Sequence, residues 1–196
     1  MLSERLKNIP VILASQSPRR KELLASLDID FTVLVRNVDE SIPKDLEAKY
    51  AAEYVCLKKL EAFDAEDFYD NLLITADTVV VNEANQPLGK PQSSVEAKDV
   101  LCRLSGRVHH VYTGVALRYR GLVHSFTSKT EVCFSDLDNE EIDYYIERYK
   151  PYDKAGSYGI QEWIGRIGVD YIHGTFENVM GLPTQKLYRE INNIIK

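Results

Sequence analysis

The stretch LASQSPRRKELLASL, Leu13–Leu27, joins the end of an expected strand to the beginning of an expected helix. The apolar run at residues 11–14 leads into it and has the length of a short buried strand. Ser17 is a favourable N-cap, and Pro18 suits the first position of a helix. The chain is therefore predicted to open with a strand, a loop and a helix.

The first turn of this helix carries three cations, Arg19, Arg20 and Lys21. A helix N-terminus favours acids, and each misplaced cation there costs several tenths of a kcal/mol up to about 1 kcal/mol. A bound anion would offset that cost, because the helix N–H groups and the small residues before them form an anion site. Arginine can also bind phosphate through two hydrogen bonds. The alternative is that the three cations are solvated surface charge.

Apolar patterning along the rest of the chain predicts alternating strands and helices, and then two antiparallel strands. Strands are expected at residues 11–14, 31–35, 72–81, 108–117 and 122–134. Helices are expected from Ser17, over 46–63, from the capping boxes at Ser93 and Asp138, and from Thr184. This order predicts an α/β fold in which helices flank a mixed β-sheet.

Composition excludes several classes of protein. The 196 residues, 44% of them hydrophobic, suffice for one domain or one domain with two lobes. The net charge of −6 argues against a general nucleic-acid binder. No apolar stretch approaches the roughly 18 residues of a membrane span, and the first residues lack the apolar region of a signal peptide. Three scattered cysteines without a CxxC motif are typical of a reduced, cytoplasmic protein.

Asp77 lies inside the apolar run LLITADTVVV, residues 72–81. Burying a carboxylate is costly unless it is paired or bound to a metal. Asp77 is therefore a candidate general base for water or a candidate ligand of a divalent cation, with the Thr78 hydroxyl beside it. The alternative is an aspartate at a strand end that accepts hydrogen bonds from nearby backbone N–H groups.

Two further polar groups suit phosphate chemistry. Lys90, in the turn LGKP, is held between a glycine and a proline and could serve as a fixed charge for phosphate. The paired acids Asp39 and Glu40 could bind a hard cation such as Mg²⁺, and Lys58 and Lys59 follow on the next expected helix. The alternative for both groups is solvated surface charge.

The late segment DKAGSYGIQ, Asp153–Gln161, contains two glycines that permit a close approach of the backbone to a ligand. The Gln161 amide can both donate and accept hydrogen bonds, as recognition of a base edge requires. The cations and carboxylates described above predict metal-assisted hydrolysis or transfer at a phosphate ester or anhydride.

Six segments of the chain resemble, in the same order, the Maf family of nucleoside triphosphate pyrophosphatases. They are LASQSPRRKELL, TADTVV, LGKP, LSGRVHHVYTGVAL, DKAGSYGIQ and NVMGLP. The resemblance implies one Maf-like domain over residues 1–196, with an elongated, two-lobed Maf/ITPase-like fold around a deep central cleft. It also implies hydrolysis of the α–β phosphoanhydride with Mg²⁺ or Mn²⁺, and clearance of non-standard or excess nucleotides. DKAGSYGIQ resembles the branch of the family that acts on dTTP and UTP.

Roles for individual residues follow from this resemblance, position by position. It assigns proton acceptance to Asp77, phosphate contacts to Ser15, Arg19, Arg20, Lys59 and Lys90, metal binding to Glu40 and Asp77, and substrate choice to Arg19, Thr78 and Gln161. The sequence LKKLEAF leaves Lys58 in competition with Lys59 for its role.

The physical case for a pyrimidine substrate concerns Gln161. Its amide offers N–H and C=O together, which matches O4 and N3–H of thymine or uracil. Cytosine reverses this edge, so discrimination requires neighbours that lock the orientation of the amide. Gly156 and Gly159 let the loop approach a small base, where a purine would clash. The alternative is that Gln161 braces the loop and the pocket accepts many bases.

Two other functions stay open at this point. A nucleotide-binding regulator of cell division or septum formation without significant catalysis would need the arginine pair but not Asp77. A phosphatase would release inorganic phosphate from the γ position instead. The expected partner is a nucleoside triphosphate rather than a nucleic acid or a membrane, and the assembly left open is a homodimer.

Overall fold

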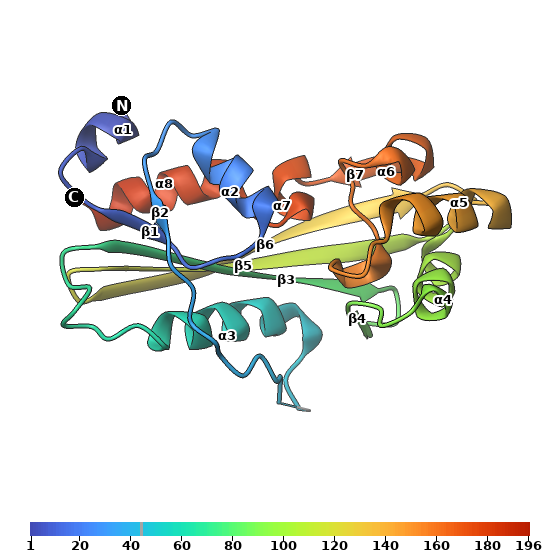
Figure 1. Cartoon of the computed structure of the whole chain (residues 1–196), viewed down its shortest axis with the longest axis horizontal. Coiled ribbons are helices and arrows are strands. Elements are labelled where there is room, and N and C mark those ends of the chain that lie inside the picture. Colours follow the sequence, from blue (N-terminus) through green and yellow to red (C-terminus); the bar gives the residue numbers. More distant parts are fainter. Residues whose placement is uncertain (44) are drawn as a thin grey trace. The chain divides into compact units, whose positions relative to one another are not determined.

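The computed structural model describes residues 1–43 and 45–196, and Figure 1 shows its helices and strands. The strands are β1 (Val11–Leu13), β2 (Thr32–Val33), β3 (Leu72–Asn82), β4 (Pro87–Leu88), β5 (Val108–Tyr119), β6 (Leu122–Phe134) and β7 (Val169–His173). The α-helices are α1 (Leu2–Leu6), α2 (Pro18–Ala25), α3 (Ala48–Glu61), α4 (Ser94–Leu104), α5 (Asn139–Tyr149), α6 (Trp163–Gly168), α7 (Phe176–Met180) and α8 (Thr184–Ile194). A short 3-10 helix, η1 (Ala155–Ser157), precedes α6.

The strands form one 7-stranded sheet in the order β2-β1-β3-β5-β6-β7, and β4 pairs with β3. β1 runs parallel to both of its neighbours, so that Ile12 lies opposite Thr32 on one side and Leu73 on the other. β3 with β4 and β6 with β7 are antiparallel pairs. The mixed sheet predicted from the sequence is confirmed.

β5 and β6 are neighbours in the sheet, and only Arg120 and Gly121 separate them along the chain. Both residues have positive φ, 48° and 78°, as the two central residues of a type I′ turn require. A loop this short can join only antiparallel strands. The predicted antiparallel pair around Gly121 is confirmed.

Contacts within the chain divide it into two compact units. Unit 1 contains Met1–Asp77, Thr113–Ser128 and Gly181–Lys196, and unit 2 contains Thr78–Tyr112 and Lys129–Met180. β3, β5 and β6 contribute residues to both units. Each unit has its own core.

In unit 1, α3 covers one face of the strands, and α2 and α8 cover the other (Figure 1). The buried positions of α3 include Ala52, Cys56 and Leu60, which recur every four residues and so form one helix face. The cluster packed between α3 and the strands consists of Ile12, Ala14, Cys56, Leu60, Phe63, Leu73 and Ala116. Apolar residues at helical spacing on α3 thus contribute to the core of unit 1.

The start of α2 is confirmed as predicted. Ser17 is the N-cap, its hydroxyl accepts a hydrogen bond from the Arg20 backbone N–H, and Pro18 occupies the first helical position. The short strand β1 ends four residues before this cap. The chain therefore passes from a buried strand, through four small or polar residues, to a helix whose N-terminal N–H groups face that loop.

In unit 2, α4, α5 and η1 pack around a second core. Asp138 and Glu141 form a complete capping box at the start of α5, as predicted. At α4 the Ser93 hydroxyl accepts from the Glu96 N–H, but the Glu96 carboxylate accepts from the N–H of Gln92 instead of Ser93. The second predicted capping box is therefore only half formed.

Several short helices were not predicted from the sequence. α1, α6 and α7 have five or six residues each, which is too short for a helical period to repeat in the sequence. The strand expected at 31–35 is reduced to Thr32–Val33. None of the helices in the described part of the chain combines the length and the apolar character that crossing a membrane requires.

Candidate active site

The loop between β1 and α2 holds a fixed arginine in unit 1. Ser15 is buried, and its hydroxyl accepts hydrogen bonds from the Ser17 N–H at 3.2 Å and from Arg20 Nη1 at 3.4 Å. Arg20 Nε donates to the carbonyl of Gly181 at 2.9 Å. The guanidinium is therefore anchored at two points beside the first turn of α2.

Charges of both signs lie around Arg20. Burial lowers the pKa of Arg20 most, and the positive charge of Arg19 lowers it further. The carboxylates of Asp77 and Glu40 act in the opposite direction and favour the charged guanidinium. The structure thus brings together four of the residues predicted to form the site.

A bridging lysine connects the two acids. Lys59 Nζ lies 2.8 Å from Asp77 Oδ1 and 2.9 Å from Glu40 Oε1. The side chains of Lys59 and Asp77 are only 15% and 17% exposed. The partner that a carboxylate needs inside an apolar strand is therefore a lysine from α3.

The two neighbouring lysines of α3 point to different partners. Lys58 Nζ lies 3.6 Å from Asp39 Oδ2 and 5.5 Å from the centre of the Tyr54 ring. Asp39 also accepts hydrogen bonds from the backbone and side chain of Ser41. Of the two candidates, Lys59 is the one that reaches Asp77.

The chemistry of this donor set fits a hard divalent cation. Oxygens from Glu40 and Asp77 converge on one point, the ammonium of Lys59, and each carboxylate has two oxygens. No group of three metal-ligating side chains occurs within residues 1–43 and 45–196. Mg²⁺ is commonly bound by one or two carboxylates, with water and substrate phosphate completing its shell. Glu40 and Asp77 could hold such an ion together with a phosphorylated substrate.

In unit 2 the segment Asp153–Gln161 lies on β3 and on the turn that contains Lys90. Gly156 has φ of 72°, and a Cβ at this position would lie 3.0 to 3.1 Å from three atoms of the Val80 side chain. The Gly156 N–H donates to the carbonyl of Gly89 at 3.3 Å. Only glycine fits this contact without strain.

Thr78 and Lys90 lie near the same contact. Thr78 precedes Val80 by two residues on β3, so the two side chains point to the same face of the sheet. Val80 lies opposite Leu88 on the antiparallel β4, and Lys90 directly follows Gly89, whose carbonyl accepts from the Gly156 N–H. Unit 2 therefore groups the predicted residues Thr78 and Lys90 with the segment that carries Gln161.

Gln161 is half-buried at the end of this segment. Its Oε1 is buried and has no hydrogen-bond partner among the described residues. A Cβ at Gly159 would lie 3.0 Å from Gln161 Nε2, so the amide occupies space that a larger residue would take. A buried acceptor without a partner suits a site that awaits a ligand donor.

The thiol of Cys56 and the imidazole of His109 are both chemically inert in this structure. Burial raises the pKa of the Cys56 thiol to about 12, so it is not a nucleophile near neutral pH. Burial lowers the pKa of His109 to about 3, and its Nε2 lies 2.7 Å from the Tyr158 hydroxyl. His109 is therefore a neutral core residue.

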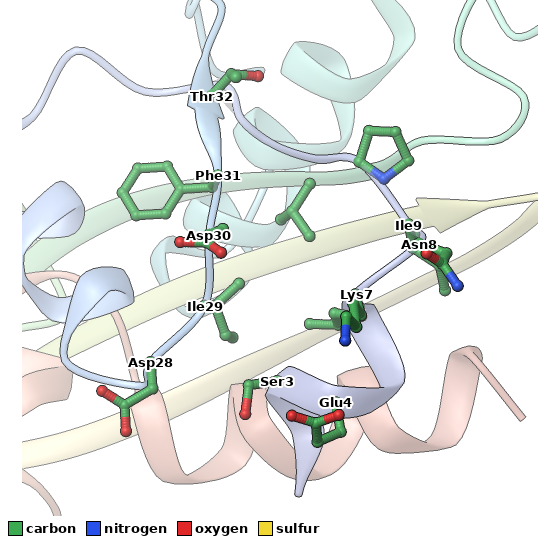
Figure 2. A pocket seen from close by; sticks show the side chains of 13 residues that line it. Ser3, Glu4, Lys7, Asn8, Ile9, Asp28, Ile29, Asp30, Phe31 and Thr32 are labelled. Carbon is green, nitrogen blue, oxygen red and sulfur yellow. The ribbon is translucent and has the colours of Figure 1, made fainter.

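A separate cavity of about 680 Å³ opens in unit 1 beside α1 and the segment between α2 and β2 (Figure 2). Glu4, Asp28 and Asp30 lie along it, with Lys7 as its one cationic lining residue. Three carboxylates would repel a polyphosphate. None of the residues predicted for the site lines this cavity.

One anchor of the site was not singled out from the sequence. The Gly181 carbonyl, which holds Arg20, belongs to the segment NVMGLP. That segment supported the family resemblance, but nothing in its composition indicated a contact with Arg20.

Comparisons with known proteins identify the family of this chain. The family model for Maf-like proteins matches residues 10–194. The dTTP/UTP pyrophosphatase of Parabacteroides distasonis is 48% identical over 191 residues, which cover 97% of this chain and 98% of that protein. The dTTP/UTP pyrophosphatase of Flavobacterium psychrophilum is 43% identical over 193 residues, 98% of each chain. By sequence and extent, the chain belongs to the Maf family.

Proposed function

We propose that this protein is a nucleoside triphosphate pyrophosphatase that hydrolyses dTTP and UTP to the monophosphate and pyrophosphate. The observation that carries the proposal is the bridge from Asp77 through Lys59 to Glu40, in the electrostatic field of the anchored Arg20. The relatives' names, dTTP/UTP pyrophosphatase, supply the substrates and the class of reaction.

Residues in the first turn of α2 and on α3 bind the phosphates of the substrate. Arg20 is already oriented by Ser15 and Gly181, so it loses little conformational freedom when a phosphate binds. Arg19 is its neighbour on the helix, and Lys59 contributes a third cation. These groups stabilise the charge that develops on the phosphates and on the leaving pyrophosphate.

Asp77 is the proposed proton acceptor. Lys59 holds one of its oxygens at 2.8 Å, which fixes the orientation of the carboxylate. The other oxygen can accept a proton from the attacking water as the new P–O bond forms. The new bond forms at the α phosphorus, the α–β anhydride bond breaks, and its electron pair leaves with pyrophosphate.

Mg²⁺ or Mn²⁺ is the proposed cofactor, held by Glu40 and Asp77 with oxygens of the substrate. A bound divalent ion would neutralise part of the triphosphate charge and polarise the phosphoryl oxygens. The protein's own part is to keep the two carboxylates close together, which Lys59 does in this structure.

Further proposed substrate contacts are Thr78, Lys90 and Gln161. Substrate choice is proposed to depend on Thr78, Gln161 and Arg19. Gln161 Oε1 is buried and has no hydrogen-bond partner among the described residues, which supports a role in accepting a hydrogen bond from a base.

We also propose a cytoplasmic location, which the free thiols of Cys56 and Cys102 support.

A substrate panel tests this proposal. With Mg²⁺ or Mn²⁺ present, pyrophosphate release from dTTP, UTP, CTP, dGTP and 7-methyl-GTP is measured for wild type and for Gln161→Ala. We expect the highest kcat/KM for dTTP and UTP, and loss of that preference in the variant. If CTP or 7-methyl-GTP is the best substrate, the assigned specificity is wrong. If nothing is hydrolysed although nucleotides bind, a nucleotide-binding regulator is favoured.

A further inference from the structure

A polar network in unit 2 surrounds the turn that carries Gln161. Glu162 follows Gln161 directly, and its Oε1 lies 3.1 Å from Lys154 Nζ. Lys154 is itself buried and also lies 2.8 Å from Asp153 Oδ1. The other oxygen of Glu162 accepts a short hydrogen bond from the Tyr145 hydroxyl.

Tyr145 holds both ends of this turn. Its oxygen donates to Glu162 and accepts from the Gly159 N–H at 3.0 Å. The Glu162 N–H in turn donates to the Gly159 carbonyl at 3.0 Å, which closes a four-residue turn with Gln161 at its third position. The base-reading amide therefore sits on a turn whose first and last residues are fixed by one hydroxyl.

The support for this hydroxyl is rigid. Tyr145 is completely buried on α5, a helix that begins with a full capping box and packs into the unit 2 core. Burial, together with Glu162, raises the pKa of Tyr145, so its hydroxyl keeps the proton that it donates. Both hydrogen bonds can therefore form at the same time.

The network also limits where the amide of Gln161 can lie. A Cβ at Gly159 would lie 2.9 Å from the Glu162 carboxyl carbon and 3.0 Å from Gln161 Nε2. The amide and the carboxylate thus both lie beside Gly159, on the side where its Cβ would point. A shift of the carboxylate would free the amide to rotate, and an amide that rotates cannot tell uracil from cytosine.

We infer that Tyr145, Lys154 and Glu162 are positioning residues that hold Gln161 in the orientation that selects thymine and uracil over cytosine. The inference rests on the proposed function, because it explains how the same residue achieves its selectivity. It adds three residues that contact no reacting atom and act only through Gln161.

The test uses the full chain and the ratio of kcat/KM for dTTP to that for CTP. Tyr145→Phe removes only the hydroxyl, and Glu162→Gln keeps the shape while removing the charge. Each is expected to lower the ratio by about threefold to tenfold, mainly through a higher KM for dTTP, because one or two buried hydrogen bonds are lost. Tyr144→Phe is the matched control, since Tyr144 is an exposed neighbour on the same helix that packs against Trp163.

A double variant separates positioning from general support of the fold. If Tyr145 acts through Gln161, Tyr145→Phe should change the ratio no further once Gln161→Ala is present. If wild type shows no preference for dTTP, the proposed specificity fails and the inference fails with it. If Gln161→Ala removes the preference while Tyr145→Phe and Glu162→Gln keep it, only the inference is overturned. Equal losses of kcat for both nucleotides, in step with a lower Tm, would also overturn it.

Discussion

Replacing Asp77 by asparagine should abolish turnover while leaving the protein folded. The substitution keeps the volume and one oxygen of the side chain, but it removes the group that accepts the proton. Loss of a general base lowers the rate by about 10² to 10⁴, equivalent to about 3 to 5 kcal/mol in the activation barrier. Binding of dTTP should be retained, because Arg20 keeps its anchors at Ser15 and Gly181.

The cost in stability should be much smaller, for a reason that the contacts provide. Removing one partner of a buried ion pair commonly costs about 3 to 5 kcal/mol. Here Lys59 retains Glu40 at 2.9 Å, and the asparagine oxygen can still accept from Lys59 Nζ. We therefore expect a loss of about 1 to 2 kcal/mol, and a Tm lower by about 2 to 8 °C for a chain of this size.

Pyrophosphate release and thermal unfolding measured on the same samples give both quantities. Asp39→Asn is the matched control, since Asp39 is exposed and pairs with Lys58, so its kcat should stay near that of wild type. An Asp77→Asn enzyme with more than a tenth of the wild-type kcat would refute the role of Asp77 as proton acceptor. Activity that falls only as the folded fraction falls would make Asp77 a structural residue.

Three further predictions concern the anchored arginine, a buried histidine and a close glycine contact. Arg20→Lys should raise KM for dTTP at least about tenfold in steady-state kinetics, because lysine cannot hold the contact to Gly181 and bind phosphate with a planar fork; an unchanged KM would contradict phosphate binding. His109 has a folded-state pKa of about 3, well below its unfolded value, so the stability from keeping it neutral is present above about pH 6.5 and is lost as pH falls toward 3. The free energy of unfolding, measured in urea at pH 7 and at pH 5, should fall between these pH values in wild type and fall less in His109→Gln. An equal fall in both proteins would contradict this prediction. Gly114→Ala would place a Cβ 2.4 Å from the backbone of Ala52 and should lower the free energy of unfolding by about 1 to 3 kcal/mol or more, whereas Gly89→Ala meets nothing within 4 Å and should be nearly neutral.

Local signals in the sequence predicted the elements that carry the candidate site. Ser17 and Pro18 marked the first residue of α2, and the apolar run around Asp77 marked β3. These signals work because a cap or a buried strand depends on residues that are neighbours in the chain. The charge pattern of the sequence also indicated that Arg20 and Asp77 are unusual residues.

Contacts between distant residues could not be predicted in the same way. Arg20 reaches Gly181 across 161 positions, and no periodicity or motif connects the two. The choice between Lys58 and Lys59 depended on how α3 is rotated against β3, which a difference of one residue decides. The hydroxyl of Tyr145 was missed for a further reason, because a tyrosine at a buried helical position reads as an ordinary core residue.

Phosphorus NMR of the products formed from dTTP tests the central claim most directly. Purified protein with Mg²⁺ or Mn²⁺ is incubated with dTTP, and the product resonances are followed until the substrate is consumed. The account predicts dTMP and pyrophosphate in equal amounts, and loss of both in Asp77→Asn. Formation of dTDP and orthophosphate would contradict cleavage of the α–β bond.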